Sequence, residues 1–295
     1  MAILYSLVMN DAFKMVCRYV ASRFDRFAQC PYLLGSCNIC GNDVAFFTES
    51  VQMYRELLKC SECGATSRYR AIAKGVLRAV YELVGVRASS VAELAKLKSA
   101  RQLTVYDTQP PFYFDNLAYP LPDMLKAVPW IEVQCSSLDP YRPLGERLGP
   151  MTTNQNLEKL TFADRSFDIL ITSDVMEHVR LAERAHAEIS RVVKPGGVYV
   201  FTVPTIRARY ETEIRVEIVD PDDPSRDIIH QLEYHGDHNN PEGRALTYRS
   251  YGSCLDDELK ALGFEVHFEM NNLPEAGIMQ TELFYCRRRV AAARP

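Results

Sequence analysis

Short apolar runs alternate with amphipathic stretches over residues 100–295, which predicts units of one strand followed by one helix. An apolar stripe at helical spacing predicts a helix over residues 181–193, ended by Lys194-Pro195-Gly196-Gly197. Because strands joined through helices usually run parallel, we expect an α/β fold with a largely parallel sheet. The first four predicted strands cover residues 103–106, 130–135, 167–172 and 198–203.

Both ends of the chain carry further predicted elements. Ser253 is expected to cap a helix that ends at Gly263, followed by strands over residues 264–270 and 281–286. At the other end, residues 1–30 are expected to form an amphipathic helix, because apolar residues recur at steps of three and four. These apolar residues are Phe13, Val16, Val20, Phe24 and Phe27.

The apolar face of this N-terminal helix needs a partner. Polar and charged residues interrupt the segment before about 18 apolar residues accumulate, so we expect no membrane span. No positively charged segment precedes the apolar stretch, so a secretory signal peptide is not expected either. The face is expected to pack on its own domain or on the partner of a homodimer, with attachment to a membrane surface as the alternative.

Two cysteine pairs of the form C-x2-C are typical of a zinc-binding module. Cys37 and Cys40 precede one glycine, and Cys60 and Cys63 precede another. Each pair places two thiolates on a tight turn, and the following glycine allows the positive φ that such a turn requires. The spacing predicts one structural Zn²⁺ ion held by four thiolates, with no open position for catalysis.

A helix is predicted directly after the second cysteine pair, from Ser67 towards Tyr81. Its apolar side is expected to carry Ile72, Val76, Val80 and Leu83. A cluster of basic and aromatic residues could bind nucleic acid, but it fits the solvent-exposed side of this helix better. The residues of that cluster are Arg68, Tyr69, Arg70 and Lys74.

Composition narrows the class of protein. The 295 residues are 47% hydrophobic and 24% charged, which excludes a disordered or repetitive chain. The 34 basic and 38 acidic side chains give a net charge of −4, so no global positive field attracts nucleic acid. A local basic patch that binds nucleic acid stays an alternative. Nine cysteines are too few for a disulfide scaffold, which favours a reducing, cytoplasmic compartment.

Three motifs carry a family resemblance. Asp164-Arg-Ser-Phe-Asp168 leads into the strand predicted at 167–172, Asp174-x-x-Glu177-His178 follows that strand, and Lys194-Pro-Gly-Gly197 precedes the next one. Together they resemble the central part of class I S-adenosylmethionine-dependent methyltransferases, of the kind called type 11. The resemblance implies a Rossmann-like sheet with strand order 3-2-1-4-5-7-6, the seventh strand antiparallel, and a cofactor at the carboxyl ends of strands 1, 2 and 4.

The cofactor positions that the resemblance implies are only partly typical of the family. The loop after the first strand contains Pro110 and Pro111 in place of glycines, so Cβ atoms stand where the family places the cofactor. The second strand ends without the usual ribose-binding carboxylate. A working enzyme therefore requires a pocket that the two prolines do not fill. The expected cofactor-binding residues are Asp107, Thr108, Gln109, Gln134, Cys135, Ser136, Asn156, Leu157, Ser173, Asp174 and Glu177.

Histidines supply the candidate catalytic residues. His178 follows the fourth strand, and Tyr234, His235 and His238 lie in residues 205–251, where the family commonly carries substrate-determining insertions. Imidazole titrates near neutral pH, so these side chains could orient the acceptor or take its proton. The alternatives are a hydrogen-bonded residue at the start of a helix for His178 and a polar loop for the others. A second metal site at His230, His235, Asp237 and His238 is disfavoured, because the spacing fits no standard pattern.

The chain is thus expected to comprise a helix (1–30), a zinc ribbon with connecting helices (31–99), and a class I methyltransferase-like domain (100–295) with an insertion (205–251). The expected reaction moves the methyl group of S-adenosylmethionine to a small molecule. Three alternatives remain: methylation of RNA, another reaction of the sulfonium cofactor, or a catalytically inactive protein that binds a partner with the same fold.

Overall fold

The computed structural model describes residues 32–50, 52–114, 117–236 and 243–290. The helix expected within residues 1–30 therefore lies outside the described residues. Among the helices of the described ranges, none combines the length and the apolar character that crossing a membrane requires.

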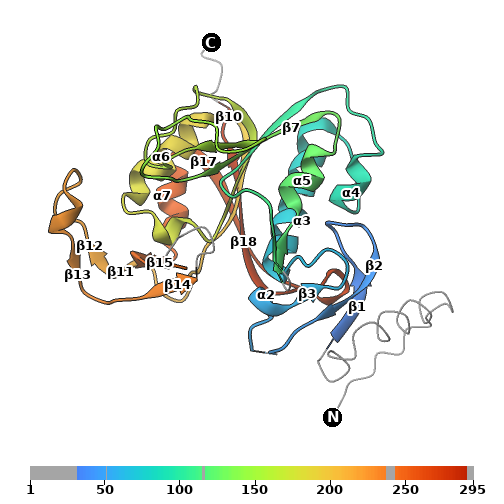
Figure 1. Cartoon of the computed structure of the whole chain (residues 1–295), viewed down its shortest axis with the longest axis horizontal. Helices are drawn as coiled ribbons and strands as arrows, with labels where there is room; N and C mark the ends of the chain where they lie inside the picture. The colour runs from blue at the N-terminus through green and yellow to red at the C-terminus, as the bar shows by residue number, and fades with distance from the viewer. Residues whose placement is uncertain (1–31, 51, 115–116, 237–242, 291–295) are drawn as a thin grey trace.

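A seven-stranded sheet forms the centre of the molecule (Figure 1). Counted along the chain, its strands lie in the order 3-2-1-4-5-7-6, and only β18 runs antiparallel to its neighbours. The largely parallel α/β sheet expected from the sequence is confirmed. The strands are β4 (Leu103–Asp107), β7 (Ile131–Ser137), β8 (Thr152–Asn154), β9 (Phe167–Ser173), β10 (Val193–Thr202), β17 (Phe264–Leu273) and β18 (Ile278–Arg288).

Helices cover both faces of the sheet (Figure 1). On β10, Val198 and Val200 join the apolar cluster of one face, while Tyr199 and Phe201 join that of the other. Every residue of β9 is buried, as expected for a central parallel strand, which explains its continuous apolar run. One face is covered by α3 (Ser67–Val84), α4 (Val91–Leu94) and α5 (Leu121–Lys126), and the other by α6 (Ala182–Val192) and α7 (Leu255–Ala261).

Two predicted boundaries differ from the structure. Strand β10 begins at Val193, because Val193 already pairs with β9 and the Pro195–Gly197 stretch forms an irregularity within the strand rather than a linker. Helix α7 begins at Leu255 with Cys254 as its N-cap residue, so the cap predicted at Ser253 is wrong. The backbone carbonyl of Ser253 instead accepts a hydrogen bond from the N–H of Asp256 (3.2 Å).

The two cysteine pairs lie in a small antiparallel sheet of β1 (Tyr32–Ser36), β2 (Asp43–Phe47) and β3 (Lys59–Cys60), here called the ribbon. Short helix α2 (Tyr54–Leu57) connects β2 to β3. Helix α3 then leaves the ribbon and packs on the large sheet, where a Cβ at Gly75 would come within 2.6 Å of Val200. The ribbon therefore joins the main domain through its own helix.

The N-terminal turns of α3 are buried on sides that the sequence pattern assigned to solvent. Arg70 is fully buried and donates hydrogen bonds to the carbonyls of Leu58 (2.9 Å) and Gly277 (2.5 Å). Tyr69 is buried against Tyr119, with 4.3 Å between ring centroids. The expectation of a solvated basic face is therefore wrong for both residues. The physical reason is that the turn before β18 and the strand β6 (Leu117–Tyr119) cover that side of the helix.

The remaining described strands form short pairs. Residues 205–251, the insertion, extend from the main sheet as an arm (Figure 1). Its pairs are β11 (Glu213–Ile214) with β16 (Arg249–Ser250), β12 (Val216–Glu217) with β13 (Ile228–Ile229), and β14 (Tyr234–Gly236) with β15 (Arg244–Leu246). Another hairpin, β5 (Phe112–Phe114) with β6 (Leu117–Tyr119), follows β4. The described residues also include short turns of 3-10 helix, which are η1 (Met176–His178), η2 (Pro224–Arg226) and η3 (Pro274–Ala276).

Candidate functional site

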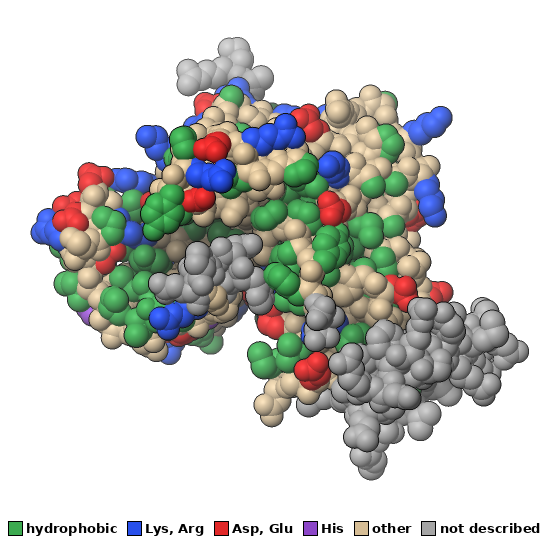
Figure 2. All heavy atoms as spheres, in the orientation of Figure 1, with side chains coloured by type: hydrophobic (Ala, Val, Ile, Leu, Met, Phe, Trp, Pro, Cys, Tyr) green, Lys and Arg blue, Asp and Glu red, His purple; other side chains and the backbone are tan. Residues whose placement is uncertain are grey.

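A large cavity opens at the carboxyl ends of β4, β7, β9 and β10, with a volume of about 1920 Å³. Figure 2 shows the molecule hollowed between the ribbon and the insertion, and residues of both line this cavity. Strand β4 has β7 on one side and β9 on the other. Strands that follow β4 in the chain are therefore added first on one side of it and then on the other, and the cavity lies at this topological switch point of the sheet. Open α/β sheets bind their ligands at this place.

The loop after β4 leaves the cavity open. Thr108 and Gln109 line it, whereas Pro110 and Pro111 are not among its lining residues. The hydroxyl oxygen of Thr108 and the amide oxygen of Gln109 are buried without a hydrogen-bond partner in the part of the chain that the structure describes. Buried polar atoms are normally satisfied, so these two atoms have bonding capacity that a ligand could use.

Asp107 lies beneath the cavity rather than in its lining. Its carboxylate accepts hydrogen bonds from the Tyr119 hydroxyl (2.5 Å) and from the Gln109 N–H (3.0 Å). Burial raises the pKa of Asp107 to about 7, although these two hydrogen bonds oppose the shift. The second hydrogen bond closes a tight turn, so a side chain shapes this glycine-free loop.

Residues from β7 and the loop after β8 form another side of the cavity. Ser136, Asn156 and Leu157 line it as the sequence predicted. Gln134 and Cys135 are not among the lining residues, and Cys135 is fully buried in the core of the sheet. The lining also includes Ser137 and Asp139, and Asp139 supplies a carboxylate just beyond the strand that lacked one.

An ion-pair network lies at the end of β9. Asp174, at a positive φ of 51°, contacts Arg55 through both carboxylate oxygens (2.6 Å each) and Arg68 at 3.4 Å. Arg68 also donates to the Ser173 hydroxyl (2.7 Å), and Arg55 donates to Glu282 of β18 (2.9 Å). Burial opposes ionisation of Asp174, but the two guanidinium charges hold its pKa well below the usual range. All five residues line the cavity.

Sequence reasoning missed Arg55 and gave Arg68 no role in the site. Arg55 lies on α2 between the cysteine pairs, with no motif around it. Its partners Asp174 and Glu282 are 119 and 227 residues away in the sequence. The only available signal was the charge at both positions, which a single sequence does not distinguish from surface charge.

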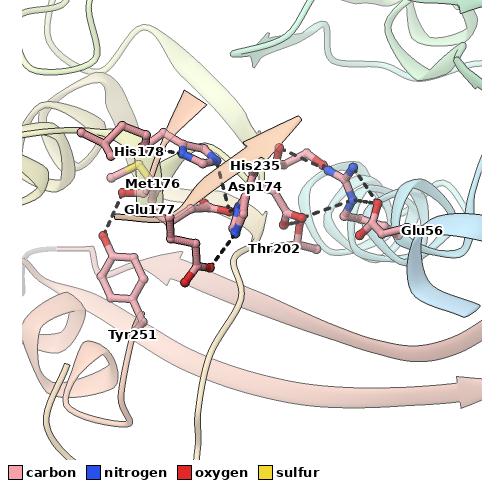
Figure 3. A network of polar contacts seen from close by, with 12 residues as sticks. Glu56, Asp174, Met176, Glu177, His178, Thr202, His235 and Tyr251 are labelled. Atoms are coloured by element: carbon pink, nitrogen blue, oxygen red, sulfur yellow. Dashed lines mark hydrogen bonds and ion pairs between the residues drawn. The ribbon is translucent and has the colours of Figure 1, made fainter. Parts of the chain in front are cut away.

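A cluster of two histidines and one glutamate lies next to this network (Figure 3). Glu177 and His178 come from η1, and His235 comes from β14 of the insertion. Oxygen Oε1 of Glu177 lies 3.7 Å from Nε2 of His178 and 3.7 Å from Nδ1 of His235. Both histidines line the cavity, while Glu177 is buried beside them. The fold therefore brings together three residues that the sequence singled out.

Hydrogen bonds fix both imidazoles and the segment below them. Nδ1 of His178 lies 2.8 Å from the Leu246 carbonyl, and Nε2 of His235 lies 3.2 Å from a Glu233 carboxylate oxygen. The Tyr248 N–H donates to the Glu177 carbonyl (2.8 Å). The contact with Glu177, together with that to Glu233, raises the pKa of His235 above its ordinary value despite partial burial.

The other residues that the sequence proposed for this region lie elsewhere. Tyr234 is exposed, stacks against the Arg244 guanidinium (4.3 Å to the ring centroid), and is not among the lining residues. His230 is exposed and lies 2.9 Å from Glu217. His238 and Asp237 lie outside the described residues.

The four ribbon cysteines converge on one point. Their sulfurs all lie within 4.8 Å of one another; Cys37 and Cys63 are 3.8 Å apart, and Cys40 and Cys60 are 3.9 Å apart. Sulfurs about 2.3 Å from a central Zn²⁺ ion at the corners of a tetrahedron are roughly 3.8 Å apart. The glycines that follow the pairs, at positions 41 and 64, have φ values of 77° and 70°, as the knuckle turns require.

Comparison with known proteins gives a family match for the centre of the chain. Residues 132–201 match the model of a family described as a methyltransferase domain. No curated protein matches the chain significantly. Similar solved structures include an S-adenosylmethionine-dependent methyltransferase from Methanosarcina mazei, with 15% identity over 66% of this chain and 95% of that chain and a TM-score of 0.40. Another, from Mesorhizobium loti, has 18% identity over 67% of this chain and 95% of that chain and a TM-score of 0.39.

The matched residues cover part of the sheet around the cavity, without β4. They include most of β7, all of β9 and α6, and β10 up to Phe201. The strand order and the antiparallel β18 extend the same architecture beyond the match. Residues 132–201 are therefore similar to a methyltransferase domain, and they lie in an α/β fold with a largely parallel sheet.

Proposed function

We propose that this protein is a methyltransferase that uses S-adenosylmethionine to methylate a small molecule. The observation that carries the proposal is the open cavity at the switch point of the sheet, which is partly lined by a segment that matches a methyltransferase domain. Thr108 and Gln109 line that cavity, and each has one buried polar atom without a partner among the described residues. These features fit an adenosyl cofactor even though the loop lacks glycine.

The residues around the cavity suggest how the cofactor would be held. The serine hydroxyls at positions 136 and 137 and the Asp139 carboxylate lie near the end of β7, where they suit ribose hydroxyls. Asn156 and Leu157 suit the polar edge and the face of adenine. When bound, the cofactor supplies a methyl group on a positively charged sulfur, so the protein mainly has to align the acceptor and exclude water.

The size of the cavity supports a separate acceptor site. Pockets for single drug-sized ligands measure about 300–1000 Å³, whereas this cavity has about 1920 Å³. His178, His235 and Tyr248 line the part that the insertion covers, where they would contact the acceptor. The arginines that line the cavity, at positions 55, 68, 142 and 180, are each paired with carboxylates, which argues against RNA as the acceptor.

Calorimetry with S-adenosylhomocysteine tests the cofactor proposal. We expect one molecule to bind per chain. Changing Asp139 to Ala should weaken binding by roughly tenfold, because a partly exposed charge-assisted hydrogen bond contributes about 1.5 kcal/mol. Asp164→Ala, which removes an exposed carboxylate outside the cavity lining, is the control and should keep the wild-type affinity. Absence of heat and of a thermal shift at millimolar ligand would favour an inactive binding protein.

We also propose that the ribbon binds one structural Zn²⁺ ion through Cys37, Cys40, Cys60 and Cys63. The support is that the four sulfurs lie within 4.8 Å of one another, with two of the separations at 3.8 and 3.9 Å, close to those of a tetrahedral site of four thiolates. Elemental analysis should find that about one zinc per chain disappears when Cys37 and Cys60 are both changed to Ser. An unchanged zinc content in that double variant would contradict this assignment.

A further inference from the structure

Three side chains able to bind a metal ion meet on the cavity wall that the insertion covers. One carboxylate oxygen of Glu177, Nε2 of His178 and Nδ1 of His235 lie within 4.8 Å of one another. We propose that these residues bind a divalent transition-metal ion whose open coordination position takes an oxygen or nitrogen atom of the methyl acceptor. The role toward the acceptor rests on the proposed function, whereas the metal site itself does not.

The first argument is the state of the Glu177 side chain. It is 1% exposed, and neither of its carboxylate oxygens has a hydrogen-bond partner within the described ranges of the chain. Burying an unpaired carboxylate is costly, so such groups are normally paired or bound to a metal. The two imidazole nitrogens at 3.7 Å are too far for good hydrogen bonds.

The same distances suit two ligands of one ion. Nitrogen and oxygen ligands lie about 2.1 Å from Zn²⁺ and similar ions. Two such ligands are then roughly 3.0 Å apart at a right angle and roughly 3.7 Å apart at an angle near 120°. The separation of 3.7 Å between Glu177 and each histidine falls at the upper end of this range. An ion could therefore bind with little movement of the three side chains.

The second argument is the orientation of the imidazoles. The Leu246 carbonyl can only accept a hydrogen bond, so Nδ1 of His178 carries the proton and Nε2 presents a lone pair. A carboxylate also only accepts, so in a neutral His235 the proton is on Nε2, toward Glu233, and Nδ1 presents a lone pair. Both lone pairs thus face the Glu177 carboxylate, and three electron-rich groups repel one another unless a cation lies between them.

The hydrogen bonds on the outer side of the rings match those of known metal sites. A histidine that binds a metal usually donates its other N–H to a backbone carbonyl or a carboxylate, which fixes the ring and makes it a better ligand. His178 has the carbonyl partner at 2.8 Å, and His235 has the carboxylate partner at 3.2 Å. Glu233 is itself held by Arg215 at 2.7 Å.

The set of ligands defines the class of ion and its position. Two imidazoles and one carboxylate suit Zn²⁺, Mn²⁺, Fe²⁺, Co²⁺ or Ni²⁺ and leave at least one coordination position open. Both histidines line the cavity and Glu177 lies behind them, so the open position faces the cavity. A hydroxyl bound there loses its proton more readily, which would make it a better methyl acceptor.

Titration of the full-length protein, prepared with one zinc per chain so that only the four-cysteine site is filled, with Mn²⁺ tests the site. Binding is monitored by calorimetry and by loss of the electron paramagnetic resonance signal of free Mn²⁺. Mn²⁺ prefers oxygen and nitrogen ligands, so it leaves the four-cysteine site to zinc. We expect one Mn²⁺ per chain. Glu177→Gln and His235→Ala should each weaken binding by more than tenfold, and Glu233→Gln by about tenfold. His230→Ala, an exposed histidine of the same insertion, is the matched control and should bind as the wild type does.

Stability measurements guard against variants that fail to fold. Glu177→Gln keeps the side-chain volume and removes a buried charge, so its Tm without added metal should equal or exceed that of the wild type. The rise in Tm that Mn²⁺ gives the wild type should be absent in this variant. Equal Mn²⁺ affinity in wild type, Glu177→Gln and His235→Ala would overturn the proposal. A wild type that binds none of Mn²⁺, Zn²⁺ and Co²⁺ beyond the four-cysteine site would also overturn it. A proton, and not a metal ion, would then lie between Glu177 and the histidines.

Binding of S-adenosylhomocysteine separates this proposal from the proposed function. We expect the wild type and the Glu177→Gln variant to bind it alike, because Glu177 is not in the cavity lining. Failure of the wild type to bind S-adenosylhomocysteine while it binds Mn²⁺ would contradict the methyltransferase proposal and keep the metal site. Binding of the cofactor without any metal binding would contradict the metal site and keep the methyltransferase proposal.

Discussion

The buried carboxylate of Asp107 should make the stability of the protein depend on pH, and Asp107→Asn should remove that dependence. Burial raises the pKa of Asp107 to about 7 in the folded protein, whereas an unfolded chain has a value near 3.9. A group with a raised folded pKa stabilises the protein fully below its unfolded pKa. This contribution is lost as the pH rises through the folded value, because the folded state must then hold a buried charge.

The size of the effect follows from the shift. About three pKa units at about 1.4 kcal/mol each give roughly 4 kcal/mol, of which roughly 3 kcal/mol falls between pH 5 and pH 8. Asparagine keeps the size of the side chain. Its amide oxygen can accept from the Gln109 N–H, and its amide nitrogen can donate to the Tyr119 oxygen. The variant therefore stays neutral without losing either contact.

Urea unfolding at several pH values measures this difference. The free energy of unfolding of Asp107→Asn minus that of the wild type should increase by about 3 kcal/mol from pH 5 to pH 8, most steeply below pH 7. Glu132→Gln removes an exposed carboxylate from the adjacent strand β7 and leaves Asp107 in place, so it should keep the wild-type profile. Parallel profiles for Asp107→Asn and the wild type would refute the assignment of a buried, neutral carboxyl group.

Two further predictions concern the ribbon and its contact with the end of the chain. Changing Cys37 and Cys60 to Ser should lower the Tm by about 10 °C or more in a thermal melt, because structural zinc contributes many kcal/mol to folding; an unchanged Tm would contradict a structural role. Gly277→Ala should destabilise the protein by about 2–4 kcal/mol in urea, since φ is 63° and a Cβ would lie 2.5 Å from the Phe46 ring. Gly85→Ala has a similar φ of 72° with nothing within 4 Å, so it should cost only about 1 kcal/mol; equal losses would rule out the clash.

The main sheet could be predicted from the sequence because its strands bury both faces. Strand β9 contains the apolar run Ile169-Leu170-Ile171 after Phe167, and such a run signals a buried parallel strand without any knowledge of its neighbours. The turns at the two cysteine pairs could be predicted for a similar reason, since each pair and the glycine that follows it are local. Features that depend on a few consecutive residues were therefore accessible.

Other parts of the site depend on residues far apart in the sequence and could not be predicted. Arg70 is buried in part because the backbone carbonyl of Gly277, which lies 207 residues away just before β18, accepts hydrogen bonds from its guanidinium. Asp107 turns beneath the cavity because the Tyr119 hydroxyl binds it there. The sequence identified Glu177 and His178 as one motif and His235 as part of another, but only the path of the insertion brings them together.

The contact between α3 and β18 has a consequence for how the chain is made. Ser67, at the start of α3, shares a hydrogen bond of 2.7 Å with Thr281, which follows it by 214 residues. At about 5–20 residues per second, a ribosome needs roughly 10–40 s to synthesise the intervening chain. During this time the buried side of α3 lacks the strand that finally covers it. The yield of folded protein in a cell should therefore depend on translation speed and on chaperones that shield the unfinished chain.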